Sequence, residues 1–416
     1  MRRRSPARTL AATALAVAGL LPLTLGAAPA AAPPVPAASV APVAPVSSGS
    51  SGSSVASAVT DDDGRALSPE LQAQLDEAIQ QVMQQAGIPG VQVGLWIRGQ
   101  GSYLRAFGVA DKETGAPMTE QLNMRIGSET KTFTATAVLQ LVDEGLIGLD
   151  DPIATYLDGV PCGEDIRVRD LLDMRSGLFP YSEDDDFVNA FLDDPDRVFT
   201  PEELLAYGYR HENEFAPGSR FQYSNSNYIL LGLLVERVSG RSLEAFVHDR
   251  ITAPSGLRHT LFPRSTELPE PYAHGYTDQT PTGAVADSTH WNPSWAWAAG
   301  ALVSDLRDLR HWAEDLVAGT LLSPGTQAQR LDVLPTGIPG AGYGLGIFDI
   351  NGWIGHNGSL PGYESLTIRL PEECATLVVL LNTDIMSQDS EPSTLLGRAI
   401  TSIVTPDHVY DIPPGK

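Results

Sequence analysis

The spacing of apolar residues changes along the chain, and it predicts helices and strands in turn. Apolar positions recur every three or four residues over 69–86, a segment that a Ser-Pro pair opens and a Gly-Ile-Pro-Gly turn closes, which predicts a helix. The β-rich runs 91–97 and 103–109 flank a short Arg-Gly-Gln-Gly segment and predict a hairpin. After Ser128 the helical spacing returns and runs to Gly145. A helix and a hairpin therefore precede a second helix, unlike the strand-helix alternation of a parallel sheet.

The rest of the chain contains helical patterns first and strand patterns later. Helical patterns cover 168–174, 201–209, 228–239, 243–251, 301–317 and 394–404, and strand patterns cover 344–350, 366–370 and 376–382. Because strands come from both ends with helices between them, one antiparallel sheet must be assembled across a helical insertion, which predicts an α+β fold. We expect a sheet subdomain of about 67–150 and 296–404, and a helical subdomain of about 151–295.

The two ends of the chain differ in composition from this domain. Residues 1–30 combine a basic start, an apolar run and small residues suited to cleavage, which predicts a secretory signal peptide. A membrane anchor is disfavoured because the apolar run is short and a proline interrupts it; the Sec and twin-arginine routes both stay open. Residues 31–66 are rich in Ala, Pro, Ser and Gly and read as a disordered linker. Residues 405–416 form a C-terminal tail.

Charge and cysteine content exclude several classes of protein. The formal net charge of −24 disfavours nucleic acid and anionic membranes as partners. The acidic runs 61–63, 183–186 and 193–196 are interpreted as solvated loops, since none matches a calcium-binding loop. Cys162 and Cys374 lack metal-ligand spacing, and nothing in the sequence brings them together as a disulfide. We therefore expect a monomer without cofactor or metal.

Ser128 and Lys131 suggest nucleophilic chemistry. Residues three apart share a face of a helix, so the Lys131 amine can reach the Ser128 hydroxyl. A desolvated lysine is one of the few groups that can take the proton of a serine, and a helix N-terminus adds unpaired N–H groups beside it. The alternative is an N-capping serine beside a solvated lysine. The pair alone does not decide between them.

Two later clusters add further candidate chemistry. Tyr223-Ser224-Asn225 precedes a helix; a tyrosine beside a lysine ammonium can have its phenol pKa lowered enough to carry protons, and the Asn225 amide can bind a substrate amide. Gly355-His356-Asn357-Gly358-Ser359 lies between strand signals, at an expected sheet edge where small residues let a substrate backbone approach. Each cluster has an ordinary alternative as a turn or a surface histidine.

The order Ser-x-x-Lys, Tyr-x-Asn, His-x-Gly is more specific than any one cluster. In this order, at residues 128, 223 and 356, the chain resembles the penicillin-recognising serine hydrolases: class C β-lactamases, serine D-alanyl-D-alanine carboxypeptidases and related esterases. The resemblance covers about 67–404 and implies a β-lactamase/transpeptidase-like fold, an antiparallel sheet flanked by helices with an inserted helical domain. His-x-Gly, where lactamases usually carry Lys-Thr-Gly, and the segment around Trp295 are most similar to the actinomycete-type carboxypeptidases.

The resemblance also implies roles for individual residues. Ser128 would be acylated, while Lys131 and Tyr223 would move its proton to the leaving group. Asn225 and Trp295 would bind substrate. His356 and Gly358 would lie along the leaving side, and the backbone N–H groups of Ser128 and Ser359 would form the oxyanion hole.

Two departures from the family's carboxypeptidases bear on the substrate. The usual His-Thr-Gly is His-Asn-Gly here, because Asn357 replaces the threonine, and the preceding strand, 345–350, has no arginine to pair with a substrate carboxylate. The leading hypothesis is a secreted D-alanyl-D-alanine carboxypeptidase acting on peptidoglycan-like peptides. The alternatives are an esterase or amidase of the same fold, a class C-like β-lactamase and a non-catalytic penicillin-binding sensor. The acyl donor, the preference for hydrolysis over transpeptidation, and β-lactam sensitivity stay open.

Overall fold

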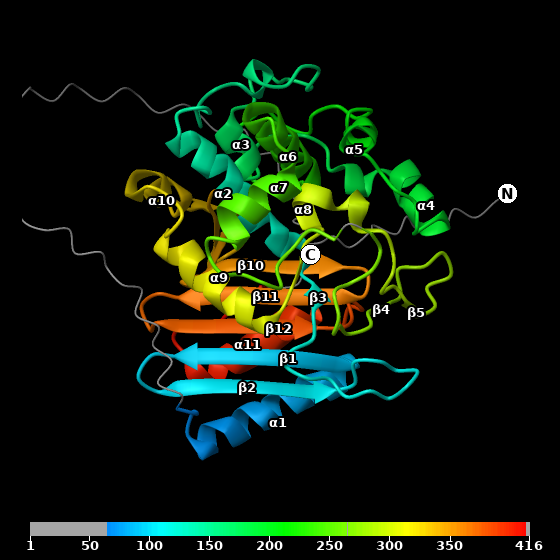
Figure 1. Cartoon of the computed structure of the whole chain (residues 1–416), viewed down its shortest axis with the longest axis vertical. Coiled ribbons are helices and arrows are strands. Elements are labelled where there is room, and N and C mark those ends of the chain that lie inside the picture. Colours follow the sequence, from blue (N-terminus) through cyan, green and yellow to red (C-terminus); the bar gives the residue numbers. More distant parts are fainter. Residues whose placement is uncertain (1–64, 264, 413–416) are drawn as a thin grey trace, which may run out of the picture.

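An eight-stranded antiparallel sheet forms the centre of the protein (Figure 1). The computed structural model describes residues 65–263 and 265–412, so the expected signal peptide and almost all of the expected linker lie outside the described residues. The strand order is β2-β1-β12-β11-β10-β9-β8-β7. The strands of this sheet are β1 (Gly90–Ile97), β2 (Gly101–Gly108), β7 (Leu334–Pro335), β8 (Ala341–Tyr343), β9 (Phe348–Ile350), β10 (Trp353–Leu360), β11 (Tyr363–Leu370) and β12 (Ala375–Leu381). The expected antiparallel sheet, built from both ends of the chain, is confirmed.

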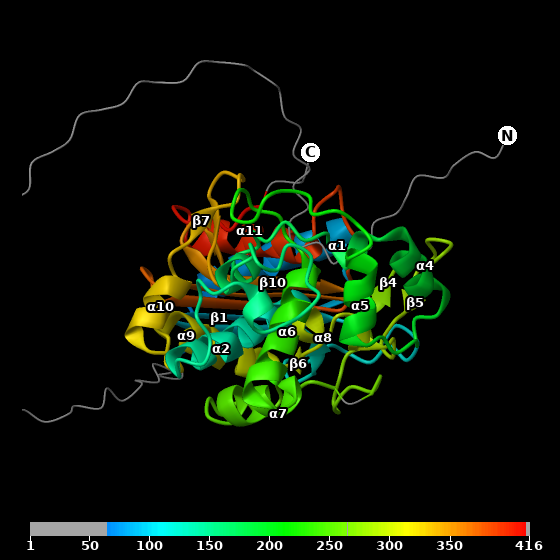
Figure 2. The ribbon, with the colours of Figure 1, turned by 90° about the horizontal axis from the view of Figure 1, so that it is seen from above.

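Helices cover both faces of this sheet (Figure 2). One face is covered by α1 (Pro69–Ala86) and α11 (Pro392–Val404), which pack against each other. Against the other face lies α9 (Leu306–Ala318), and the remaining helices form a group on the same side of the sheet, next to β10 (Figure 1). They are α2 (Thr130–Asp143), α3 (Val168–Leu172), α4 (Asp185–Asp193), α5 (Pro201–Gly208), α6 (Asn225–Ser239), α7 (Leu243–Val247), α8 (Trp297–Gly300) and α10 (Pro324–Arg330).

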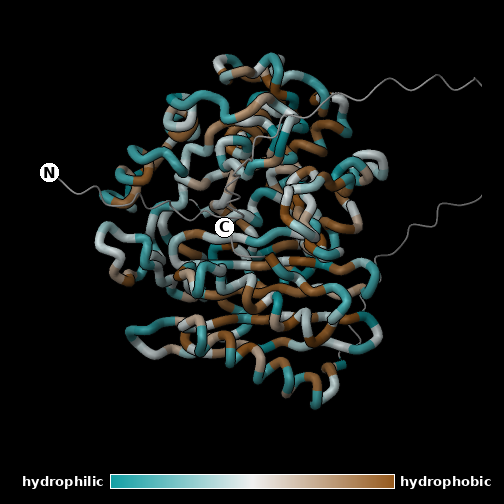
Figure 3. The backbone as a smooth tube through the Cα atoms, turned by 180° about the vertical axis from the view of Figure 1, so that it is seen from behind, coloured by the Kyte–Doolittle hydropathy of each residue, from teal (hydrophilic) through white to brown (hydrophobic). Residues whose placement is uncertain are grey.

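Burial on both faces explains the composition of the central strands. Every residue of β1 and β12 is buried, which is why β12 reads as a continuous apolar run rather than an alternating one. The same strands are predominantly hydrophobic in Figure 3. Two short pairs, β3 (Met124–Arg125) with β6 (Val303–Ser304) and β4 (Tyr276–Thr277) with β5 (Ala286–Asp287), join the loops beside the sheet.

Most of the predicted elements are confirmed, and three are corrected. The first helix, the hairpin and the last two strands lie where the pattern predicts. The predicted strand 344–350 is instead a turn leading into β9, because Gly346 has φ +80° and lies so close to α2 that a Cβ would sit 2.4 Å from that of Ala135. The helix predicted from 301 begins at Leu306, where Asp305 caps it after β6.

The third correction concerns the acidic run at 183–186. It is not a solvated loop: Asp184 is buried and caps α4, accepting a hydrogen bond from the Phe187 backbone N–H. α4 thereby presents Phe187 and Phe191 to the core. Within the part of the chain that the structure describes, no helix is long and apolar enough to cross a membrane. Cys162 and Cys374 are both free.

Candidate active site

Ser128 lies in a tight turn that feeds directly into α2. Gly127–Glu129 form a single 3-10 turn, and Gly127 has φ +51°, a conformation that favours glycine. A Cβ on Gly127 would lie 2.7 Å from the backbone nitrogen of Ser359. The turn therefore packs directly against β10, and it brings the nucleophile candidate of one segment beside the predicted oxyanion donor of another.

The predicted contact between Ser128 and Lys131 is present. The Lys131 Nζ lies 2.9 Å from the Ser128 Oγ, 2.8 Å from the Asn225 Oδ1 and 2.7 Å from the Ala299 carbonyl oxygen. Lys131 is fully buried, and burial lowers its pKa well below the ordinary value. A neutral amine has two N–H groups and one lone pair. The two carbonyl oxygens only accept, so they take both N–H groups and leave the lone pair facing the Ser128 hydroxyl.

Tyr223 lies near the same hydroxyl, in the loop before α6, and its own buried hydroxyl makes no direct hydrogen bond within the protein. Its ring lies 4.9 Å from the Lys131 Nζ. Burial raises the pKa of Tyr223 well above its usual value, and the nearby Ser128 hydroxyl lowers it by less. The expectation of a lowered phenol pKa is therefore wrong, because desolvation outweighs the neighbouring groups. The phenol is neutral, so it is suited to donate a proton rather than to accept one.

Asn225 is the first residue of α6 and holds Lys131 in place. Its Oδ1 accepts from Lys131, and its Nδ2 donates to the Ser182 Oγ at 3.2 Å. Next to Ser182, the Tyr181 hydroxyl donates to the backbone carbonyl of Trp295. Ser182 and Tyr181 were not predicted, because nothing in their local pattern marks them. They connect the Tyr-x-Asn cluster to the Trp295 segment.

His356 lies in β10 on the face of the sheet that carries Ser128. Burial lowers the pKa of His356 to about 3, so the ring is neutral. Its Nδ1–H donates to the Asn357 backbone carbonyl at 2.5 Å, and its Nε2 then accepts from the Tyr343 hydroxyl at 3.2 Å. Both ring nitrogens are occupied within the protein. Tyr343 escaped the sequence analysis because its only signal is its contact with His356.

The predicted sheet edge at the His-x-Gly cluster is local. β9 pairs with β10 only at residues 353–355, so residues 356–360 have β11 on one side and the Ser128 turn along the other. Asn357 points to the opposite face of the sheet, where its Nδ2 donates to the Glu391 Oε2 at 2.8 Å. It therefore does not take the place of a substrate-facing threonine.

Replacing Gly358 by alanine should lower kcat by about 10²-fold, because a Cβ there would lie 2.0 Å from the Ile126 carbonyl oxygen and would push the Ser128 turn away from β10. Steady-state kinetics with a reactive ester checks this result. The matched control is Gly325→Ala in α10, where the nearest heavy atom lies 4.0 Å from the new Cβ, and activity should be unchanged. Full activity in the Gly358 variant would show that the close approach is not needed.

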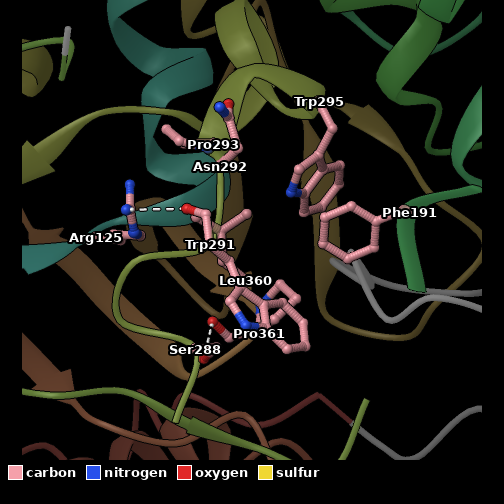
Figure 4. Close-up of a pocket in the computed structure, with 9 residues that line it drawn as sticks. All are labelled: Arg125, Phe191, Ser288, Trp291, Asn292, Pro293, Trp295, Leu360 and Pro361. Carbon is pink, nitrogen blue, oxygen red and sulfur yellow. Dashed lines mark hydrogen bonds between the residues drawn. The ribbon is translucent and has the colours of Figure 1, made fainter. Parts of the chain in front are cut away.

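A small cavity lined by aromatic rings lies beside these residues (Figure 4). Phe191 and Trp295 form one wall, with ring centroids 5.1 Å apart. On another side lies Arg125, whose Nη2 donates to three backbone carbonyls and whose buried Nη1 has no hydrogen-bond partner. Leu360, which directly follows Ser359, completes the wall next to the site. The cavity thus adjoins the predicted oxyanion hole.

The chain is similar to hydrolases of D-amino-acid compounds. A D-stereospecific amidohydrolase from Streptomyces sp. has 31% sequence identity and a TM-score of 0.72, covering 80% of this chain and 99% of that one. D-amino acid amidase from Ochrobactrum anthropi SV3, complexed with D-phenylalanine, has 28% identity and a TM-score of 0.71, covering 80% and 99%. D-aminopeptidase from Brucella anthropi is 31% identical over 304 residues, which is 71% of this chain and 56% of that protein. The chain spans between about half and two thirds of the length of the curated relatives it matches.

These comparisons and the site agree on the class of protein. Residues 75–399 match the family model described as Beta-lactamase. The chain therefore belongs to the Beta-lactamase family, and it has the α+β fold of that family. More particularly, it is similar to a D-stereospecific amidohydrolase, a D-amino acid amidase and a D-aminopeptidase.

Proposed function

We propose that this protein hydrolyses the amide bonds of D-amino-acid amides and short D-peptides through an acyl-enzyme on Ser128. The observation that carries the proposal is the charge of the site. On the leaving-group side of Ser128, the described cation candidates are the buried Lys131, which already contacts Ser128, Asn225 and Ala299, and a neutral histidine with both nitrogens occupied. Arg125 lines the cavity that is assigned below to the acyl side chain. A substrate with a free carboxylate on its leaving group would therefore lack a partner. An amide or amine leaving group needs none.

The reaction uses the described groups as follows. The Lys131 amine takes the Ser128 proton while the Oγ attacks the substrate carbonyl, and the N–H groups of Ser128 and Ser359 stabilise the oxyanion. The neutral Tyr223 phenol donates its proton to the leaving nitrogen as the C–N bond breaks, and the Lys131 ammonium returns a proton to Tyr223. Water then attacks the ester in the same way and releases the acid and the free Ser128.

The aromatic cavity is the natural place for the side chain of the acyl residue. Its walls are largely apolar and aromatic, which suits a side chain such as that of phenylalanine. The relative that binds D-phenylalanine supports this choice of substrate. Trp295, expected to bind substrate, would do so as part of this wall.

The second candidate is the D-alanyl-D-alanine carboxypeptidase of the sequence analysis. The His356-x-Gly358 pattern favours it, since that pattern is most similar to the actinomycete-type enzymes. It requires a way to hold the terminal carboxylate, and the neutral His356 does not supply one in its present hydrogen bonds. Export through the N-terminal segment would suit either substrate, and both export and the monomeric state stay predictions.

A substrate panel distinguishes these activities. D-phenylalanine amide should be cleaved at least about tenfold faster than its L-isomer and than D-alanine amide, while diacetyl-Lys-D-Ala-D-Ala should release no D-alanine. Release of D-alanine without amide cleavage would replace the proposal by the carboxypeptidase. Ester hydrolysis alone would indicate an esterase, and rapid opening of a chromogenic cephalosporin would indicate a β-lactamase. If mass spectrometry finds no Ser128 adduct with a fluorophosphonate, the sensor is the remaining reading.

A further inference from the structure

Two buried carboxyl groups lie behind β10, on the face of the sheet opposite Ser128. Glu364 in β11 is buried, and Glu391 at the N-cap of α11 is partly buried with its Oε1 shielded from solvent. The charge of Glu391 raises the pKa of Glu364 beyond the effect of burial. The Glu391 Oε2 accepts from the Asn357 Nδ2 at 2.8 Å, and the Glu364 Oε2 accepts from the Ser393 backbone N–H at 2.7 Å. The pair thus joins the start of α11 to the two central strands.

The position of the pair along the strands is its most informative property. In the antiparallel register Glu364 lies directly opposite Ser359, and the residues of such a pair share a face of the sheet. Asn357, which Glu391 holds, is two residues before Ser359 and lies on that same face. Glu391 therefore binds β10 at Asn357, and Glu364 is paired in register with Ser359, whose backbone N–H is proposed to stabilise the oxyanion.

The charge of the pair is not balanced by a cation. Among the described residues no ion pair reaches Glu364 or Glu391, and two unpaired buried carboxylates would be very costly. Four buried oxygen atoms at this place have no hydrogen-bond partner: Glu364 Oε1, Glu391 Oε1, Asn357 Oδ1 and Ser393 Oγ. Three of them can only accept while the carboxyl groups are ionised. A carboxyl proton between them supplies the missing donor.

The neighbouring charged groups that influence the pKa of this pair are acidic, so none of them supplies a positive charge. Asp384 after β12 and Glu391 itself both raise the pKa of Glu364 beyond the effect of burial. Beyond the effect of burial, the charges of Glu391, Glu129 and Glu364 raise the pKa of the Tyr410 phenol, which follows α11. The charge of Glu391 likewise raises the pKa of the Tyr223 phenol. The surroundings thus favour the protonated state of the pair.

We propose that Glu364 and Glu391 share a proton and act as positioning residues that fix the oxyanion-forming part of β10 from behind. This inference rests on the proposed role of the Ser359 N–H. While the proton is present, the pair holds Asn357 and the start of α11 together. When the proton leaves to solvent, two adjacent buried carboxylates repel each other and β10 shifts against the Ser128 turn.

The sign of the pH dependence follows from burial. Burial raises the pKa of Glu391 from 4.5 to about 8, so the folded protein binds a proton that the unfolded chain has lost. The corresponding stability is fully present below about pH 4.5 and is lost as pH rises through about 8. Glu391→Gln keeps the shape of the side chain, and its amide can still form a hydrogen bond with Asn357. Because that amide is neutral at every pH, the variant should not lose stability as the pH rises.

The experiment measures thermal unfolding and ester hydrolysis between pH 5 and 9.5 in the wild-type protein, Glu391→Gln and Glu364→Gln. In the wild type we expect the melting temperature to fall progressively from pH 5 to about 8 and then to level off, and kcat to fall as the pH rises through about 8. Both declines should be reduced in either variant, with KM nearly unchanged. Glu129→Gln is the matched control, since the pKa of Glu129 is also raised by burial to about 8 although this residue lies on the Ser128 face, beside Ser365 and Thr367.

Each outcome decides the question. If only Glu129→Gln removes the alkaline decline, the titrating group is Glu129 and the pair has no positioning role. If both variants of the pair unfold at every pH, Asn357→Ala, which removes only the link to β10, should still lower kcat about tenfold, and unchanged kcat there overturns the proposal. These measurements use a simple ester, whose hydrolysis requires Ser128 but not a preference for D-amides. If the proposed D-amide activity failed, the test of the carboxyl pair would therefore still be valid.

Discussion

Lys131→Ala and Ser128→Ala should each lower kcat by about 10³-fold or more, and the double variant should lose little beyond either single one. The reason is that the two residues act as one unit. Ser128 is an inert hydroxyl without a base, and the Lys131 lone pair faces only the Ser128 Oγ once Asn225 and Ala299 have taken its N–H groups. Single-turnover kinetics with an ester, followed by mass spectrometry of the acyl-enzyme, measures each loss.

The chain offers a matched control for this prediction. Lys112 is the other lysine among the described residues, and its ammonium lies over the ring of Tyr276 rather than in a buried site. Lys112→Ala should retain wild-type kcat. If the losses at Ser128 and Lys131 multiplied in the double variant, the two side chains would be acting independently and the dyad would be wrong.

The lowered pKa of Lys131 also predicts the acid side of the pH profile. An ordinary lysine is protonated at neutral pH and cannot act as a base, whereas burial holds this amine neutral at pH values far below its usual range. Activity should therefore persist at neutral pH and fall only when acid protonates the amine. This acid limb is opposite in direction to the alkaline decline assigned to the carboxyl pair.

The part of the site that follows from local geometry could be predicted from the sequence. The three-residue spacing of Ser128 and Lys131 on a helix fixes their contact, and the helical pattern after Ser128 shows where that helix begins. The approach of Asn225 to Lys131 across 94 residues has no local signal. It could be expected only from the order of the three clusters, that is, from the family resemblance.

Other properties depend on packing that a sequence does not display. The pKa of Tyr223 was expected to be lowered, because the nearby lysine was visible in the pattern and the complete burial of the phenol was not. The direction of Asn357 depends on the strand register, which a shift of one residue would reverse. α4 escaped notice because its acidic start, read as solvent-exposed, is a buried cap.

Tyr223→Phe should lower kcat on amides by about 10²-fold to 10⁴-fold while changing ester hydrolysis much less. The phenol is the proton donor to the leaving nitrogen in the proposed reaction, and an amine leaves poorly without a proton, whereas a nitrophenolate leaves unaided. The substitution removes one oxygen atom and keeps the ring against Lys131. Comparing kcat for an amide and for its p-nitrophenyl ester measures the difference directly.

Tyr228→Phe separates this chemical role from packing. The Tyr228 ring also lies near the Lys131 Nζ, at 5.6 Å, but its hydroxyl donates to the Leu172 backbone carbonyl at 3.0 Å and does not face the nucleophile. This variant should lose about 1 kcal/mol of stability from the missing hydrogen bond and keep an amide-to-ester ratio close to that of the wild type. Equal losses on amide and ester in the Tyr223 variant would mean that the phenol supports Ser128 itself, and a different group would then have to protonate the leaving nitrogen.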